Sequence, residues 1–278
     1  MWMTPLHSAA ATDAAHDDSV TSVTTISQNW FDAPICRNCS TNLSTTYCGS
    51  CGQKAARRLS FGDLVKESWE RIRWFEKDSL KTLFRLIFQP GLVARDYVHG
   101  KRASYMHPLK LLVALVAILV LILAANQYFQ RFDFVGQNRD VERMAQRVVN
   151  YANWSFTLGI AAIFLGSWIG FRRRSNYNAI EHAVLAIYCQ NLILAIVILN
   201  LLPTLVWHSS HFILLHKQAS AYYLYAIKLA IVATAYSQFF RLNIARDWPR
   251  LLLACLIYAA ASWLLLRGYA TAILWIVQ

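Results

Sequence analysis

Long apolar segments without charged residues constrain this chain more than any other feature of its sequence. Nearly all of them lie after Leu109, and about 20 apolar helical residues are needed to cross a bilayer core of about 30 Å. We therefore expect an all-α membrane protein whose body, 109–278, is a bundle of five transmembrane helices. The expected spans lie near 109–126, 153–171, 179–206, 220–240 and 249–267.

The composition agrees with a membrane protein that carries a polar head. Of the 278 residues, 56% are hydrophobic and 15% are charged, a balance that soluble domains seldom show. The chain also has 27 Lys and Arg residues and a net charge of +12. Beside apolar spans, such an excess favours anionic membrane lipids as partners and argues against nucleic acid.

The distribution of Lys and Arg among the loops predicts the orientation in the membrane. Basic residues concentrate at Arg172–Arg174, after the second span, and around Arg246, after the fourth. The loops after the first and third spans have no such excess, so we expect them outside and the basic loops in the cytoplasm. Five spans then give a cytoplasmic N-terminus and a periplasmic C-terminus. Residues 268–278 are apolar but too short to span alone, and either extend the fifth helix or lie in the interface.

The head divides into three parts by composition. Residues 1–33 are rich in Ala, Ser, Thr and Asp without a helical or strand period, and we expect a disordered tail. They lack the basic start and apolar stretch of a cleavable signal peptide. Residues 34–53 carry paired cysteines, and residues 54–108 contain amphipathic patterns that we expect to form cytoplasmic interfacial helices.

Two Cys-x-x-Cys pairs form the strongest motif in the chain. Cys36 and Cys39 are followed, after eight residues, by Cys48 and Cys51. This spacing is typical of a zinc ribbon, in which four thiolates enclose one ion and leave no open coordination position, so the zinc would be structural. An iron site of the rubredoxin kind and a redox dithiol pair are the alternatives.

Apolar residues recur at helical spacing in two segments after the cysteines, 61–75 and 80–88, before Pro90-Gly91 ends the pattern. Ser60 and Asp63 have the spacing of a capping box at the start of the first segment. Lys and Arg residues flank both apolar faces. A lipid headgroup interface and packing on the body require the same pattern, so both interpretations stay open.

Three stretches of the chain share motifs with one known family. They are Cys-x-x-Cys followed by Tyr47-Cys48-Gly49-Ser50-Cys51-Gly52-Gln53; Leu80-Lys81-Thr82-Leu83 leading to Pro90-Gly91 and Arg95-x-Tyr97-x-x-Gly100-Lys101-Arg102-x-x-Tyr105-x-x-Pro108; and Asn176-Tyr177 followed by Glu181-His182. Together they resemble a family of uncharacterised bacterial membrane proteins, the domain-of-unknown-function family three-six-six-seven. One departure is the longer gap before Glu181. The resemblance covers residues 36 to about 200, and it implies a bacterial inner-membrane location, a zinc ribbon and no known reaction.

The segment before the first span is a candidate lipid or partner site. Its candidate residues are Arg95, Tyr97, Lys101, Arg102 and Tyr105. Lys and Arg side chains can bind lipid phosphates, and tyrosines favour the half-hydrated membrane interface. The following proline, at 108, should start the transmembrane helix. Simple anchoring and a dedicated site for a lipid headgroup or protein both explain this pattern.

Polar residues inside the spans are further candidates because their burial requires a partner or water. The candidates are Glu181, His182, Tyr188, Asn191, Asn200 and Lys228. A carboxylate beside an imidazole could move protons, but an acid at a helix N-terminus is also favourable for stability alone. For Lys228 we expect either a contact with Asn200, at the same depth of the neighbouring span, or extension of its ammonium toward the headgroups.

Three functions fit this organisation. The first is a membrane protein without catalytic chemistry, in which the ribbon and basic helices bind a cytoplasmic protein or lipid. The second is a transporter of small solutes, lipid or protons that uses Glu181, His182 and Lys228, and the third is an enzyme that acts on lipid. The sequence has few acids and histidines in the spans, which favours the first.

Overall fold

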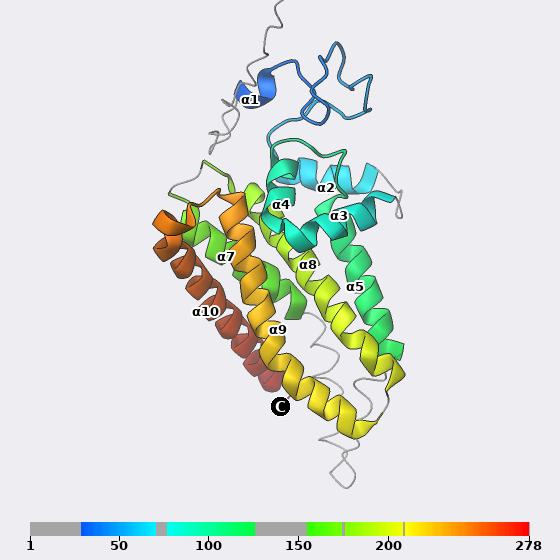
Figure 1. Cartoon of the computed structure of the whole chain (residues 1–278), viewed down its shortest axis with the longest axis vertical. Helices are drawn as coiled ribbons and strands as arrows, with labels where there is room; N and C mark the ends of the chain where they lie inside the picture. Colours follow the sequence, from blue (N-terminus) through cyan, green and yellow to red (C-terminus); the bar gives the residue numbers. More distant parts are fainter. Residues whose placement is uncertain (1–28, 71–76, 126–154, 174–175, 208, 278) are drawn as a thin grey trace, which may run out of the picture.

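The computed structural model describes residues 29–70, 77–125, 155–173, 176–207 and 209–277. Within these ranges the chain forms helices and no β-strand, with two isolated bridges in the cysteine segment. Figure 1 shows an elongated molecule with a helical bundle below and the cysteine segment at one end. The expected tail, 1–33, lies largely outside the described residues.

The helices follow the chain from the head into the bundle. They are α1 (Asn29–Asp32), α2 (Phe61–Glu70), α3 (Lys77–Phe88), α4 (Pro90–Val98), α5 (Pro108–Ala125), α7 (Ser155–Phe171), α8 (Ala179–Val206), α9 (Ser210–Phe239) and α10 (Ile244–Val277). Ser60 starts α2 as expected, since its Oγ accepts the Asp63 N–H at 3.2 Å.

Three described helices are long and apolar enough to cross a membrane: α5, α8 and the part of α10 from Ile244 to Ala272. The expected third span coincides with α8, and the first begins at Pro108. Helix α10 continues through Gly268 to Val277, so the apolar end of the chain extends the fifth expected helix. The structure therefore supports a helical membrane protein, while α7 and α9 do not meet the same criteria of length and apolarity.

The bundle packs closely where α7 lies against α10. A Cβ at Gly170 would lie 2.8 Å from the Ala254 Cβ, and one at Gly166 would lie 3.0 Å from the Ala254 carbonyl oxygen. The two glycines stand one turn apart, so their missing side chains let the helix backbones approach. Tyr236 from α9 joins the same contact, since its hydroxyl donates to the Ile163 carbonyl at 2.6 Å.

The Pro90-Gly91 pair ends α3 as expected, but it also begins α4, which the sequence pattern did not indicate. Proline is favoured in the first helical turn because its missing N–H would have no partner there. Gly91 lies against α9, where a Cβ would be 2.2 Å from the Ala235 carbonyl oxygen. Its N–H donates to the Gln238 Oε1 at 3.0 Å. Helix α4 is thus fixed between the head and the bundle.

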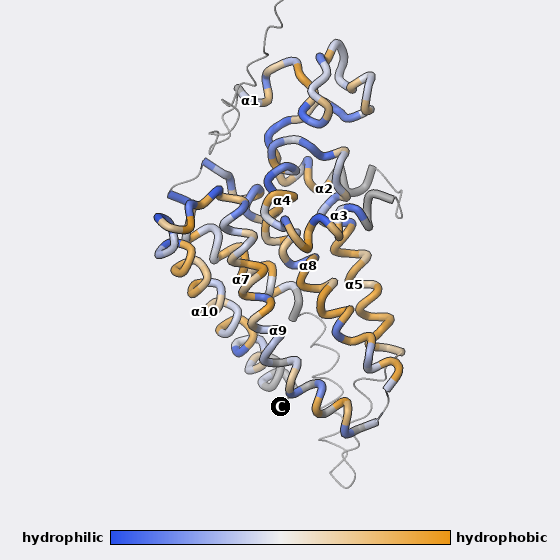
Figure 2. Tube along the Cα trace, in the orientation of Figure 1, coloured by the Kyte–Doolittle hydropathy of each residue, from blue (hydrophilic) through white to orange (hydrophobic). Residues whose placement is uncertain are grey.

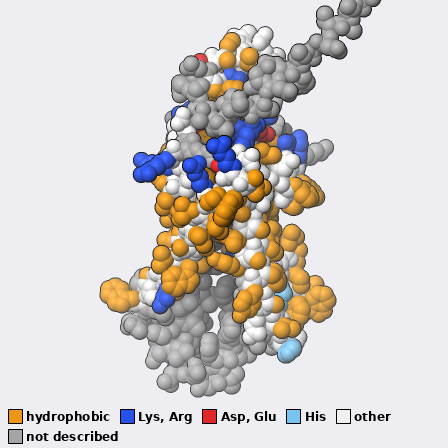
Figure 3. Space-filling model, turned by 60° about the vertical axis from the view of Figure 1, so that its left-hand side comes forward, with side chains coloured by type: hydrophobic (Ala, Val, Ile, Leu, Met, Phe, Trp, Pro, Cys, Tyr) orange, Lys and Arg blue, Asp and Glu red, His pale blue; other side chains and the backbone are white. Residues whose placement is uncertain are grey.

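Polarity changes sharply along the molecule. Figure 2 shows apolar residues along the bundle helices and polar residues toward the cysteine end. On the face in Figure 3, Lys and Arg side chains gather in a belt between the head and the apolar band. A basic belt at one end of an apolar band is typical of membrane proteins.

Candidate metal centre and its contact with the helical body

Cys36, Cys39, Cys48 and Cys51 lie together, as their spacing predicts. Their Sγ atoms are all within 4.8 Å of one another, with Cys36 and Cys51 at 3.6 Å and Cys39 and Cys48 at 3.5 Å. In a tetrahedral site with metal–sulfur bonds of about 2.3 Å, neighbouring sulfurs are about 3.8 Å apart. The cluster therefore fits one tetrahedral ion, and zinc and iron both accept four thiolates.

Two equivalent turns hold the cysteines. The Ser40 N–H donates to the Cys36 carbonyl at 2.8 Å, and the Gly52 N–H donates to the Cys48 carbonyl at 2.8 Å. Both donors have a left-handed backbone, with φ of 62° at Ser40 and 69° at Gly52. Glycine adopts this conformation without strain. The repeated turn directs both thiols of each pair to one point.

The thiols differ in their protonation. Hydrogen bonds from Thr41 lower the pKa of Cys39 to about 6, whereas burial raises the pKa of Cys36 to about 11. A metal ion requires all of its cysteine ligands as thiolates, and its charge supplies the stabilisation that a buried thiolate lacks. Burial of Cys36 is thus favourable with a cation bound.

Gln53, directly after the second turn, fixes the cysteine segment to the body. Its side chain is 4% exposed and contacts the loop that joins α4 to α5. The amide Nε2 donates to the Gly100 carbonyl at 2.7 Å, and the Oε1 accepts the N–H groups of Arg102 at 3.0 Å and Ala103 at 2.8 Å. Ser104 adds a hydrogen bond to Asn38 at 2.6 Å. The loop is therefore bound at both ends.

Gly100 is required at this contact for two reasons. Its φ of +104° disfavours residues with a side chain, and a Cβ would lie 2.8 Å from the Ala56 Cβ and 3.0 Å from the Arg37 Cβ. The glycine in the Gly-Lys-Arg motif thus lets the loop approach the cysteine segment.

Residues just before the first cysteine also belong to this contact. The Trp30 indole N–H donates to the His99 carbonyl at 3.2 Å, and the Arg37 guanidinium lies 4.2 Å from the Trp30 ring centroid. Arg37 also donates to the Trp30 carbonyl. The expectation of a disordered tail up to residue 33 is therefore wrong for α1, because Trp30 is held by His99 and Arg37.

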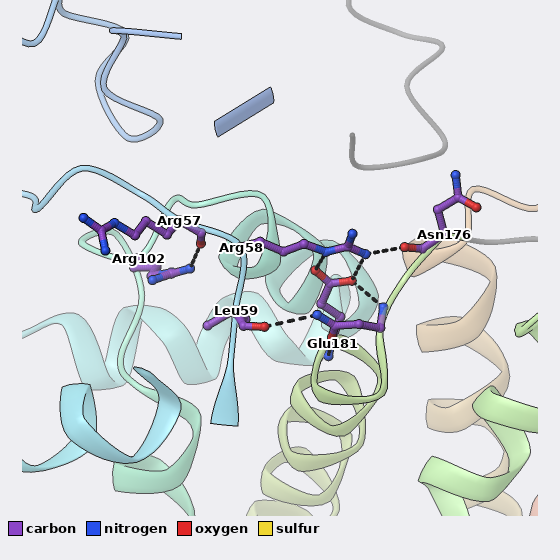
Figure 4. A network of polar contacts seen from close by, with 7 residues as sticks. Arg57, Arg58, Leu59, Arg102, Asn176 and Glu181 are labelled. Carbon is purple, nitrogen blue, oxygen red and sulfur yellow. Dashed lines mark hydrogen bonds and ion pairs between the residues drawn. The ribbon is translucent and has the colours of Figure 1, made fainter. Parts of the chain in front are cut away.

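A polar network joins the segment after the cysteines, at Arg58 and Leu59, to α8 (Figure 4). The Arg58 Nε lies 3.1 Å from the Glu181 Oε1, and Glu181 is fully buried. The carboxylate also accepts the Asn178 N–H at 2.7 Å, and the Asn178 Oδ1 accepts the Glu181 N–H at 2.9 Å, which completes a capping box. The Asn178 amide donates to the Leu59 carbonyl at 3.1 Å. Glu181 thus stabilises the start of α8, as its position at the helix N-terminus predicts, and Arg58 is its cationic partner.

The candidate lipid residues lie at different depths from those expected. Tyr97 is 1% exposed, Arg95 and Tyr105 are 6% exposed, and none of the three lies at the surface. The Tyr105 hydroxyl donates to Asp96 at 2.9 Å, and Lys101 pairs with the same carboxylate at 3.7 Å. The expected half-exposed positions of the two tyrosines are thus wrong, since Tyr97 is buried against Tyr188 of α8 and Tyr105 is buried beside Asp96.

Arg102 is also engaged within the protein. Its guanidinium donates to the Arg57 carbonyl, a contact drawn in Figure 4. Together with its N–H bond to Gln53, this ties Arg102 to the connection after the cysteine segment. Of the candidate lipid residues, Lys101 is the most exposed.

Two histidines lie where the head meets the body. Burial lowers the pKa of His99 to about 4 and that of His107 to about 4. The His99 Nδ1 lies 2.8 Å from the Arg95 carbonyl, and the His107 ring meets the Tyr97 ring edge to face at 5.9 Å. Both imidazoles are neutral at pH 7 because their surroundings leave little water around a charge.

The polar residues of α8 serve helix packing. The Tyr188 hydroxyl donates to the Met106 carbonyl at 2.8 Å, and the Asn191 amide donates to the Pro108 carbonyl at 3.0 Å. These bonds join α8 to the first residue of α5 and to the segment just before it. His182 is fully buried, with its Nδ1 3.1 Å from the Ser167 hydroxyl.

Asn200 accepts a hydrogen bond from the Tyr223 hydroxyl. Within the described ranges, no hydrogen bond joins Asn200 to Lys228. The expected pairing is thus not observed, and the described partner of the Asn200 oxygen is the hydroxyl of Tyr223, nearer to the start of α9. The Lys228 side chain is partly exposed.

Comparison with known proteins identifies one family. Residues 78–120 match the family described as "Protein of unknown function (DUF3667)". The matched segment runs from α3 to α5 and contains the loop that Gln53 contacts. The family expected from the sequence motifs is thereby confirmed in this segment. No curated protein and no solved structure shows a significant match to the chain.

Proposed function

We propose that this chain, which carries the DUF3667 segment, is a multi-pass bacterial inner-membrane protein that holds a zinc ribbon rigidly at the cytoplasmic surface for a protein partner. The observation that carries the proposal is the Gln53 contact. A ribbon on a flexible linker would not need a buried amide that makes three hydrogen bonds to the loop at Gly100. Because the inner face is occupied, the outer face, with Tyr47 55% exposed, is the one available to a partner.

Zinc is the ion that we infer for the site. The four thiolates are supplied entirely by the protein, so a bound zinc would have no open position and would stabilise the fold without taking part in a reaction. Metal analysis of protein purified in detergent should find about one zinc per chain. An iron-type visible spectrum, or stoichiometric zinc in a Cys36→Ser, Cys39→Ser, Cys48→Ser, Cys51→Ser variant, would contradict the assignment.

The proposed topology has five spans, with α7 and α9 crossing beside the three apolar helices. The positions of Arg172, Arg173, Arg246 and Arg250 at the ribbon end support a cytoplasmic location of that end. An impermeant thiol reagent applied to intact cells should label Ser209→Cys, between α8 and α9, and should not label Asn243→Cys, between α9 and α10. The opposite labelling would overturn the topology.

A photoreactive residue at Tyr47 tests the partner role. Benzoylphenylalanine at this position should form a discrete protein adduct in cells, and the adduct should disappear when Cys36 and Cys39 are both serine. The matched control is benzoylphenylalanine at Leu256, an exposed position of α10 in the apolar band. An adduct of the same size from both positions, or one that survives loss of the cysteines, would contradict recognition of the ribbon.

A further inference from the structure

The last turns of α3 expose an apolar face. Phe84 is 66% exposed, Ile87 is 51% exposed and Phe88 is 75% exposed, all on one side of α3. The opposite side is fully buried at Thr82 and Leu86. We call the segment Phe84–Gly91 the elbow. One side of α3 is thus buried against the protein, while the other presents three apolar side chains at the surface.

The elbow lies level with the ends of the bundle helices and not with the ribbon. The Gln238 side chain donates to the Phe88 carbonyl at 3.1 Å and accepts the Gly91 N–H at 3.0 Å. Gln238 stands in the last turn of α9, which ends at Phe239. Figure 1 shows the junction of α3 and α4 beside the upper end of α9. This depth corresponds to the boundary between hydrocarbon chains and headgroups.

Basic residues on the same helix complete the pattern. Lys81 and Arg85 are exposed, and the Arg85 guanidinium lies 5.5 Å from the Tyr105 ring centroid. They precede Phe84 and Phe88 by three residues each, so on a helix each base lies next to an exposed aromatic ring. At the depth of the membrane interface, the cations can bind anionic headgroups while the neighbouring aromatic rings contact the hydrocarbon chains below.

We propose that the elbow inserts into the membrane leaflet on the ribbon side and binds anionic phospholipid. Phe84, Ile87 and Phe88 would lie among the upper chain segments, and Arg85, together with Lys81 one turn before it, would contact the phosphates. Phe88 contacts Gln238 in the last turn of α9, so it lies at the level of the membrane-embedded bundle. A soluble protein would bind a surface that extends beyond the bundle, so lipid fits this position better. The inference does not depend on a protein partner at the ribbon.

Photocrosslinking in nanodiscs of equal phosphatidylglycerol and phosphatidylcholine tests the proposal. Benzoylphenylalanine replaces Phe88 in the full chain, Leu256 as the lipid-facing control in α10, and Tyr47 as the control on the ribbon. We expect lipid adducts from positions 88 and 256 and none from position 47. At position 88 the phosphatidylglycerol adduct should exceed the phosphatidylcholine adduct, and at position 256 the two should be equal.

Neutralising the bases separates charge from burial. Lys81→Gln and Arg85→Gln, each in the chain labelled at position 88, should lower the preference for phosphatidylglycerol by up to about fivefold while lipid adducts persist. A thermal unfolding midpoint equal to that of the parent chain verifies folding. Absence of lipid adducts at position 88 while position 256 forms them, or a protein adduct in their place, would overturn insertion. Equal yields of the two lipids at position 88 would overturn the anionic preference.

Discussion

The Arg58 guanidinium lies against the Glu181 carboxylate, at 3.1 Å between Nε and Oε1, although 123 residues separate the two in the chain. This contact ties the segment after the ribbon to the first turn of α8. With the Gln53 contact, it gives the ribbon two independent attachments to the helical body.

Arg58→Met should lower the free energy of unfolding by about 1–3 kcal/mol, because it leaves the buried Glu181 carboxylate without its cationic partner. The same change should cost less in a Glu181→Gln background, where no charge is left unpaired. Thermal or denaturant unfolding in detergent measures both. Lys101→Met is the control, since its ion pair with Asp96 is 48% exposed on the lysine side and should contribute less than about 0.5 kcal/mol. If Arg58→Met and Lys101→Met lowered the free energy of unfolding equally, Arg58 would have no special role.

Gln53→Leu should destabilise the attachment of the ribbon by about 1–3 kcal/mol, because the N–H groups of Arg102 and Ala103 lose a buried acceptor. Limited proteolysis should then cut between the ribbon and α2 at lower protease concentrations, with the metal content of the purified protein unchanged. Asn42→Leu replaces an exposed amide of the same ribbon and should leave the cutting pattern unchanged. Unchanged protease resistance in Gln53→Leu would rule out the proposed attachment.

Gly100→Ala should destabilise the head by about 1–3 kcal/mol, through its left-handed backbone and the close approach of Ala56. The matched control is Gly49→Ala within the ribbon, where a Cβ would meet no atom within 4 Å. Denaturant midpoints of the two variants provide the comparison. A Gly100→Ala protein as stable as Gly49→Ala would mean that the loop does not approach the ribbon as the structure shows.

Acid should loosen the junction of head and body. The pKa values of His99 and His107 are about 4 in the folded protein, below the ordinary value of 6.5. The unfolded chain therefore binds more protons as the pH falls below about 6.5, and stability is lost from there down to about 4, at up to about 1.4 kcal/mol per pKa unit for each histidine. Unfolding of the parent between pH 7.5 and 4.5 should show this decline, and a His99→Gln, His107→Gln variant should show a smaller one. Identical pH profiles would place the loss elsewhere, for example in the cysteines.

Local patterns predicted the parts of this molecule whose physics is local. The length of the apolar segments predicted α5 and α8, because a membrane-spanning helix forms its backbone hydrogen bonds within a single segment. The Cys-x-x-Cys spacing predicted the cluster, because each pair of cysteines lies in one turn. Helix α4 was not predicted, because Pro90 was interpreted only as the end of the preceding helix, although proline also favours the first turn of a new one.

The attachment of ribbon to body depends on contacts between distant segments, which no periodicity reveals. In the sequence Arg58 is one of several bases after the cysteines, and Tyr97 fits the pattern of an interfacial anchor, because burial by another segment leaves no local signal. A signal for Gln53 was present: it follows Gly52 directly in the motif that resembles the family, at a position that the cysteine site itself does not require.

Hydrogen exchange of the α4–α5 loop, measured with and without metal, tests most directly whether the metal-bound ribbon is fixed to the helical body. In the structure the N–H groups of Arg102 and Ala103 donate to the Gln53 side chain, so we expect them to exchange slowly in the metal-bound protein. Removal of the metal by a chelator should unfold the ribbon and accelerate exchange in the peptide that covers 100–104, while a peptide from α10 keeps its protection. Exchange in 100–104 that is equally slow after verified loss of the metal would contradict the account.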